Sequence, residues 1–304
     1  MRHLSTLIFI VFPWVLCAQE IQVDGIYYGI VGTRTAYVTH PGMWATDTEQ
    51  WPTVYEGDLT IPSSITYNGR TYSVRSIGES AFAGCDALTS VQLPSSVTAI
   101  SACAFLGCES LRHIDVPDGL LSVNDCAFTG CTSLREISLP RHAYRVDSLA
   151  FYCCASLSSI VLPHTIEKVC HGALQHLPKI TDLYCFASVP PVAEQEAFTM
   201  SDQQHCTLHV PVETLHSYQQ TSSWSNFKEF VPITDQEYLD QGYLRGDVND
   251  DGKVDADDLR LLQRLIVSIR DKQAVNWCAD VNGDGKVNAV DYVILANSLQ
   301  SASQ

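Results

Sequence analysis

The sequence predicts a two-domain chain, in which a β-rich solenoid of 23-residue repeats is followed by a small all-α domain with two loop-helix motifs. The first observation is an apolar pattern that returns every 23 residues between Ala81 and Pro163. The second is a pair of acidic twelve-residue segments that begin at Asp247 and Asp280. The 304 residues are too many for one typical core and suit two domains.

The solenoid is predicted by columns of equivalent residues. Each unit has a Leu-x-x-Ile-x-Leu stretch, expected to form a short strand, and an Ala-Phe-x-Gly-Cys stretch, expected to form a helical turn and bend. The columns are Leu88, Leu111, Leu134 and Leu157; Val91, Ile114, Ile137 and Ile160; Phe82, Phe105, Phe128 and Phe151; and Cys85, Cys108, Cys131 and Cys154. One unit has too little apolar surface to fold alone, so stacking is expected to bury the columns in one core.

Both ends of the solenoid are expected to carry caps, because bare ends expose core and strand edges. Residues 19–75 are the expected N-terminal cap, with a hairpin that turns at Asn68-Gly69. Residues 76–233 are expected to contain the repeats and a C-terminal cap. The polar segment 234–243 is the expected linker, and residues 244–304 form the second domain.

The repeat pattern closely resembles the BspA-type leucine-rich repeats of bacterial surface proteins. The resemblance covers about residues 60–233, counting the closing segment, and implies a binding scaffold.

The residues flanking the central Ile or Val of each strand are expected to point away from the core, because side chains alternate along a strand. Stacked, they form a mildly acidic strip that suits a protein or peptide partner, with Asp115 and Glu136 as candidate contacts. An ordinary solvated sheet face is the alternative interpretation. The strip comprises Ser90, Gln92, His113, Asp115, Glu136, Ser138, Ser159, Val161, Asp182 and Tyr184.

Each acidic segment fits a calcium-binding frame, with oxygen ligands at positions 1, 3, 5, 9 and 12, a backbone carbonyl at position 7 and Gly at position 6. Short Asp and Asn side chains at alternate positions point their oxygens at one centre. The predicted ligands are Asp247, Asn249, Asp251, Lys253, Asp255 and Asp258 in the first loop, and Asp280, Asn282, Asp284, Lys286, Asn288 and Asp291 in the second. The two frames predict two calcium ions; the alternative is a pair of Asx-rich turns without metal.

An amphipathic helix is expected after the first loop, because Leu259, Leu262 and Ile266 recur at helical spacing. Such a tandem loop-helix pair, over roughly residues 244–299, resembles a type I dockerin. The resemblance implies calcium-dependent docking onto a cohesin-like domain of a scaffold or cell-surface protein, usually within extracellular polysaccharide-degrading assemblies. The candidate partner contacts, at positions that match the dockerin contact helix, are Arg260, Gln263 and Arg264. An ordinary solvated helix face is the alternative interpretation of these three residues.

Residues 1–18 are predicted to be a secretory signal peptide, since a short basic start precedes a mostly apolar stretch that is too short to span a membrane. No later stretch is long and apolar enough for a transmembrane segment. We therefore expect a secreted or cell-surface protein. A lipid anchor on Cys17 is less favoured, because Leu16 stands where a small residue normally precedes the lipid-modified Cys. The formal charge of −16 argues against nucleic acid as a partner.

No catalytic residue is predicted. The sequence contains no His-Glu-x-x-His zinc motif, no Gly-x-Ser-x-Gly elbow and no phosphate-binding glycine loop. The repeated cysteines are expected to be buried and mostly free, acting as small apolar residues. A disulfide such as Cys103–Cys126 is the alternative, because neighbouring coils bring equivalent residues close to disulfide range.

These patterns favour an exported, non-catalytic recognition or adhesion protein. Its repeat surface would be tethered through the calcium-dependent module to a cohesin-type or other surface protein, and a host matrix or cell-surface protein is a further candidate partner. One alternative is a structural surface protein whose second domain only stiffens the C-terminus. The other is a component, catalytic or not, of an extracellular polysaccharide-degrading complex.

Overall fold

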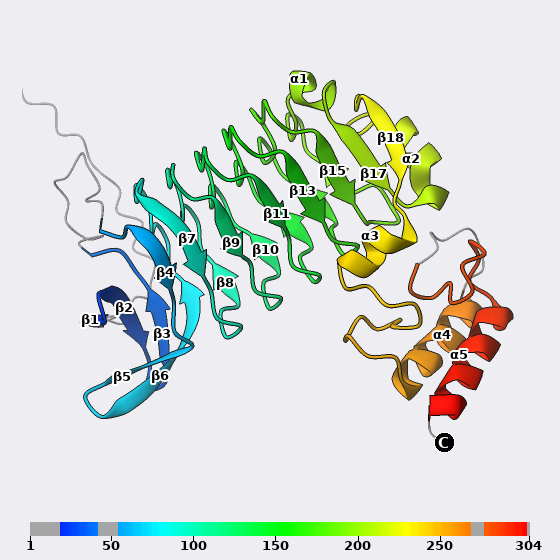
Figure 1. Cartoon of the computed structure of the whole chain (residues 1–304), viewed down its shortest axis with the longest axis horizontal. Coiled ribbons are helices and arrows are strands. Elements are labelled where there is room, and N and C mark those ends of the chain that lie inside the picture. The colour runs from blue at the N-terminus through cyan, green and yellow to red at the C-terminus, as the bar shows by residue number, and fades with distance from the viewer. Residues whose placement is uncertain (1–18, 42–53, 269–276, 303–304) are drawn as a thin grey trace, which may run out of the picture.

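The chain winds into a solenoid whose coils stack side by side, and a small helical module lies at its C-terminal end (Figure 1). The structure is a computed structural model that describes residues 19–41, 54–268 and 277–302. The expected signal peptide and Cys17 lie outside the described residues.

The N-terminal end of the solenoid is a six-stranded sheet. It consists of β1 (Gln19–Val23), β2 (Ile26–Val31), β3 (Thr35–Val38), β5 (Ser64–Tyr67), β6 (Arg70–Ile77) and β8 (Ala99–Ile100). The predicted hairpin is confirmed, because β5 and β6 pair across Asn68 and Gly69. Both turn residues have positive φ, 49° and 73°, which an Asn-Gly pair tolerates. β6 also pairs in parallel with β8, and this pairing joins the sheet to the first coils.

Each coil contributes one strand to a face of parallel strands, as the repeat predicts. One sheet of this face contains β4 (Gly57–Thr60), β7 (Leu88–Gln92) and β9 (His113–Asp115). The next sheet contains β11 (Glu136–Ser138), β13 (Ser159–Leu162), β15 (Asp182–Cys185), β17 (Thr207–Val210) and β18 (Glu229–Pro232). Pairing is in register, so that Ile137 lies beside Ile160 and Ile160 beside Leu183. A second ladder of short parallel strands contains β10 (Ser122–Val123), β12 (Arg145–Val146), β14 (Lys168–Val169) and β16 (Val192–Ala193).

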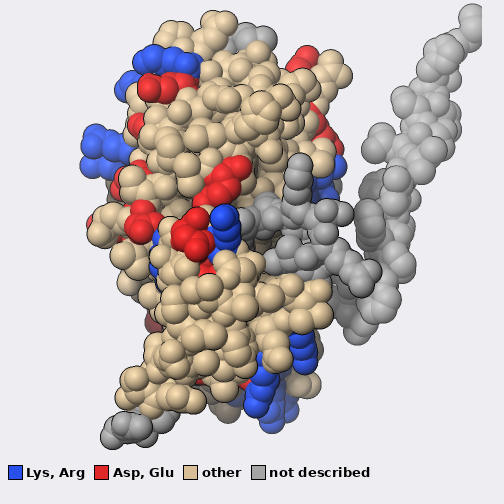
Figure 2. Space-filling view, turned by 90° about the vertical axis from the view of Figure 1, so that its right-hand side faces the viewer, with Lys and Arg blue, Asp and Glu red and all other residues tan. Residues whose placement is uncertain are grey.

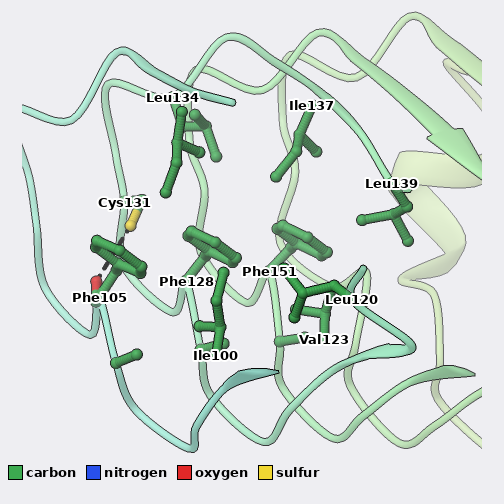
Figure 3. Close-up of a cluster of buried hydrophobic side chains, with 14 of the residues drawn as sticks. Ile100, Phe105, Leu120, Val123, Phe128, Cys131, Leu134, Ile137, Leu139 and Phe151 are labelled. Atoms are coloured by element: carbon green, nitrogen blue, oxygen red, sulfur yellow. Dashed lines mark hydrogen bonds between the residues drawn. The ribbon is translucent and has the colours of Figure 1, made fainter. Parts of the chain in front are cut away.

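The core of the solenoid is the predicted set of columns (Figure 3). Phe82, Phe105, Phe128 and Phe151 are fully buried, and successive rings stack with centroids 5.0, 5.2 and 5.4 Å apart. The Cys column is equally buried, and the Cys131 thiol donates a hydrogen bond to the carbonyl of Phe105 at 3.2 Å. The thiols therefore act as small core groups with a local hydrogen-bond partner.

The C-terminal end of the solenoid is closed by an aromatic cap. It includes α1 (Met200–Gln203), a 3₁₀ turn η1 (Val212–Thr214) and α2 (Leu215–Gln220). Trp224 and Tyr218 are fully buried, and both polar tips have partners. The Trp224 indole donates to the carbonyl of Pro191, and the Tyr218 hydroxyl to that of Ala187, each at 2.8 Å. Buried Tyr and Trp need such partners, so the cap covers the end of the core while the polar groups of both side chains remain hydrogen-bonded.

The segment expected as a polar linker contains a helix, α3 (Asp235–Asp240). Thr234 and Glu237 form a capping box, in which each side chain accepts a hydrogen bond from the backbone N–H of the other residue. Tyr238 and Tyr243 are buried against Phe186 of the solenoid. This segment thus carries an apolar contact between the solenoid and the module, which contains α4 (Ala256–Ser268) and α5 (Ala289–Ala302).

Candidate functional site

The first acidic loop turns its side-chain oxygens inward. Asp247, which is fully buried, accepts hydrogen bonds from the backbone N–H groups of Asp251 and Gly252, both at 3.0 Å. Asp258, also fully buried, accepts from the N–H groups of Val248, Asn249 and Asp255 at 2.8, 3.1 and 2.8 Å. Gly252 has a φ of 82°, as the sharp turn requires.

The second loop repeats four of these five bonds at the equivalent positions. Asp280 accepts from Asp284 and Gly285 at 3.0 and 2.8 Å, and Asp291 accepts from Asn282 and Asn288 at 3.2 and 2.9 Å. Both helices begin directly after an Asp or Asn of the loop, whose side chain accepts a hydrogen bond from the backbone of the first turn. Asp255 accepts from the N–H of Asp257, and Asn288 accepts from that of Val290, both at 2.8 Å. The two loops are therefore structural equivalents, each leading into a helix.

The loops have the donor chemistry that calcium requires. Asp258 and Asp291 are fully buried carboxylates, and no ion pair reaches either of them from the residues that the structure describes. A buried carboxylate without a counter-charge is costly, and a bound cation would supply that charge. Among the described residues, no three His, Cys, Asp or Glu side chains already converge on a metal position. The other oxygens in the predicted frame also come from Asp and Asn side chains and from the carbonyls of Lys253 and Lys286, and such an all-oxygen set suits calcium rather than a transition metal.

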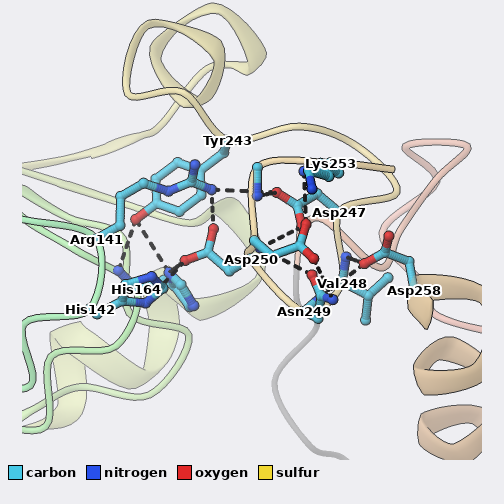
Figure 4. A network of polar contacts seen from close by, with 12 residues as sticks. Arg141, His142, His164, Tyr243, Asp247, Val248, Asn249, Asp250, Lys253 and Asp258 are labelled. Atoms are coloured by element: carbon cyan, nitrogen blue, oxygen red, sulfur yellow. Dashed lines mark hydrogen bonds and ion pairs between the residues drawn. The ribbon is translucent and has the colours of Figure 1, made fainter. Parts of the chain in front are cut away.

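Arg141 of the solenoid lies against the first loop (Figure 4). Its guanidinium forms an ion pair with Asp250 and lies 3.8 Å from Oδ2 of Asp247. The same guanidinium lies 4.9 Å from the ring centroid of Tyr243, whose hydroxyl accepts from the backbone N–H of His164 at 3.1 Å. Burial is the main cause that raises the pKa of Asp247. Sequence reasoning missed this contact, because nothing in the spacing links position 141 to position 250.

A second contact lies beside the second loop. The Trp277 ring stacks on Tyr238 at 4.4 Å, and the guanidinium of Arg245 lies 4.3 Å from the Trp277 ring centroid. Asp235 accepts hydrogen bonds from the Trp277 indole at 3.0 Å and from Arg245 at 2.8 Å. The hydrogen bond from Trp277, with a smaller effect of Arg245, lowers the pKa of Asp235. The first loop is thus in contact with the solenoid, and the residues beside the second loop are in contact with the segment that follows the solenoid.

The two helices of the module present different surfaces. On α4 the predicted contacts Arg260, Gln263 and Arg264 are exposed, and Arg260 pairs with Asp257. On α5 three large apolar side chains are exposed near the start of the helix: Val290, Val293 and Ile294 are 51%, 53% and 38% exposed. Figure 2, which views the molecule from the side of the module, shows a largely uncharged area in its lower half. Sequence reasoning missed this apolar face, although its i, i+3, i+4 spacing was a visible signal.

The predicted strip is exposed or half-exposed along the strands. Asp115, Glu136 and Ser138 are exposed, and Tyr184 is half-buried. At the C-terminal end, α3 forms one wall of a groove of about 270 Å³ over β11, β13 and β15. The acidic lining residues of the groove are Glu136, Glu237 and Asp240, and none of its described lining residues is basic. The strip thus ends in an acidic groove that the strand pattern alone did not predict.

A solenoid of parallel coils with a duplicated acidic loop-helix module defines a repeat protein with an appended binding module. Residues 61–181 match the family model of the BspA type leucine rich repeat region, in 6 copies. Residues 245–300 match that of the dockerin type I domain. The chain therefore combines segments that belong to these two families. No curated protein matches the chain.

Solved structures of leucine-rich-repeat proteins are similar to this chain. The pneumococcal vaccine antigen PcpA is 20% identical over 65% of this chain and 51% of that chain, with a TM-score of 0.50, which shows a leucine-rich-repeat fold. A leucine rich repeat protein of T. pallidum is 24% identical over 70% of this chain and 83% of that chain, with a TM-score of 0.48. One from Bacteroides capillosus is 28% identical over 46% of this chain and 96% of that chain, with a TM-score of 0.36.

Both families are non-catalytic modules that are typical of extracellular or cell-surface proteins, and dockerin domains bind cohesin partners. Together they indicate a role in protein–protein interaction or adhesion. Within the described ranges, no helix is both long enough and apolar enough to cross a bilayer.

Proposed function

We propose that this protein is an exported, non-catalytic recognition or adhesion protein with two working surfaces. The strand strip binds a protein or peptide, and the C-terminal module attaches the chain to a cohesin-type or other surface protein in a calcium-dependent manner. The observation that carries the proposal is the pair of loops with equivalent buried carboxylates, on a chain that also presents an exposed strand face.

Two calcium ions are proposed, one in each loop. Asp247, Asn249, Asp251, Asp255 and Asp258, with the Lys253 carbonyl, would hold the first, and Asp280, Asn282, Asp284, Asn288 and Asp291, with the Lys286 carbonyl, the second. Bound metal would offset the repulsion between these carboxylates and order the loops. Titration calorimetry of the full chain should give two bound calcium ions per molecule. A chain that takes up no calcium would overturn the proposal.

The partner of the module is proposed to be a cohesin-like domain. Arg260, Gln263 and Arg264 on α4 offer a polar contact surface, and Val293 on α5 belongs to an apolar one. Binding of the full chain to purified type I cohesin domains should appear with calcium and vanish with chelator. Arg264→Glu should weaken it if α4 is the contact, and Val293→Asp if α5 is. Arg34→Glu, on the far N-terminal sheet, is the matched control. Calcium-dependent binding that survives both module variants would refute these contact assignments.

The strand strip is proposed to bind a host matrix or cell-surface protein. Its carboxylates at Asp115 and Glu136 are exposed, and His113 pairs with Asp115 at 2.9 Å. The chain carrying Asp115→Lys and Glu136→Lys should lose adhesion to immobilised matrix proteins. The control carries Glu109→Lys and Asp118→Lys, which make the same charge change at exposed positions outside the strip. Equal adhesion by both variants and the parent would exclude the strip as the main contact.

A further inference from the structure

Cys103 and Cys126 occupy the same position on neighbouring coils. The backbone N–H of Cys103 donates to the carbonyl of Asp125, and that of Cys126 to the carbonyl of Ser148, both at 2.9 Å. Both residues have a φ of 55°, so their side chains leave the two backbones in the same direction. Hydrogen-bonded neighbouring chains lie about 4.8 Å apart. That spacing falls within the range of about 4.4–6.8 Å between the Cα atoms of disulfide partners.

These two thiols differ from the buried Cys column. Cys85, Cys108, Cys131 and Cys154 are fully buried, and the thiols of the last three donate to backbone carbonyls at 3.1–3.2 Å. Eleven free cysteines are described, and the partly exposed ones are Cys103, Cys126 and Cys153. Cys153 belongs to another position of the repeat, so Cys103 and Cys126 are the partly exposed pair that shares a column. Burial, followed by the nearby Cys126 thiol, raises the pKa of Cys103.

We propose that Cys103 and Cys126 form a disulfide that covalently joins two neighbouring coils of the solenoid. The oxidant is a disulfide reagent, either an oxidoreductase or a small-molecule disulfide. The thiolate of one cysteine attacks the reagent disulfide, forms a mixed disulfide and releases one thiol. The second cysteine attacks the mixed disulfide, forms the Cys103–Cys126 bond and releases the other thiol. The protein loses two protons and two electrons, and the reagent gains both.

The cross-link acts where a solenoid is vulnerable. Each coil is held only by its neighbours, so loss of one coil interface separates the chain into two stacks. A bond across the interface lowers the conformational entropy of the unfolded chain, and this raises the free energy of unfolding. The buried column cannot replace it, because an oxidant cannot reach fully buried thiols that are already hydrogen-bonded.

The test uses the folded full-length protein in buffers of oxidised or reduced glutathione. Peptide mapping without reduction should find one linked pair, Cys103 with Cys126, with the mass of two hydrogen atoms lost. The thermal midpoint of the oxidised protein should rise by several degrees, and Cys103→Ser or Cys126→Ser should abolish that rise. Cys153→Ser is the control, since it removes a partly exposed thiol from another column and should leave the link and the rise unchanged.

Three results of the peptide map would overturn the proposal. Cys103 and Cys126 could both remain free thiols after oxidation, each could carry its own glutathione, or either could be linked to a different cysteine. A rise in the thermal midpoint that persists in Cys103→Ser would also overturn it. The linked peptide is read directly, so a variant that folds poorly does not affect the parent result.

Discussion

The contact between solenoid and module depends on Tyr243, and Tyr243→Ala should release the module from the solenoid. The side chain is 3% exposed, with ring centroids of Phe186 and His164 at 5.2 and 5.4 Å. Removing a buried aromatic ring costs about 3–5 kcal/mol. The backbone N–H of His164 also loses its acceptor, which costs about 1–3 kcal/mol when the group stays buried. Even the sum of the two lower values would reduce, more than a hundredfold, the equilibrium constant between the module in contact with the solenoid and the released module.

Limited proteolysis of the full chain in calcium measures this change. Cleavage within residues 234–246 should accelerate in Tyr243→Ala, because proteolysis of a rapidly opening segment follows the population of the open form. Tyr243→Phe, which removes only the hydroxyl, should give a smaller increase. Tyr144→Ala, at a Tyr that is 44% exposed, is the control. If Tyr243→Ala is cut no faster than the control, the contact does not hold the two parts together.

Three more predictions concern single side chains. Asp258→Asn should weaken calcium binding at the first loop at least about tenfold by calorimetry, because the buried carboxylate loses its charge, whereas Asp257→Asn, at an exposed position, should not. Phe128→Ala should lower the free energy of unfolding by about 3–5 kcal/mol in urea titrations, since its ring lies between two stacked rings. The lowered pKa of Asp235 means that its stabilisation is present above the unfolded pKa of about 3.9 and is lost as the pH falls through the folded pKa. The stability of Asp235→Asn should therefore fall less than that of the parent below about pH 4.

The regular parts of the structure could be predicted because each of their residues has an equivalent elsewhere in the sequence. Phe128 is buried between Phe105 and Phe151, and the three residues recur at one spacing. The loop side chains follow in the same way, since Asp247 and Asp280 make the same bonds from the same position of the frame. A repeated residue therefore indicates its own packing, because it lies against its equivalents in the neighbouring coils.

The contact between the two parts could not be predicted because it joins unique residues. Arg141 and Asp250 are far apart in sequence, and neither has an equivalent with the same partner. A local signal for α3 was present, since Thr234-Asp-Gln-Glu237 is a capping-box pattern, but the polar composition favoured a linker. The burial of Tyr238 and Tyr243 has no signature in spacing, because it depends on where the solenoid ends.

The attachment at Arg141 and His164 also determines where this protein can change its length. Backbone bonds between coils run to immediate neighbours, so a duplicated coil placed before Arg141 would extend the strand face by about 4.8 Å and leave the attachment intact. A coil inserted between His164 and Tyr243 would move the module away from Arg141 and break the ion pair with Asp250. Repeat duplication and deletion are therefore expected to be tolerated on the N-terminal side of the attachment and excluded on the other.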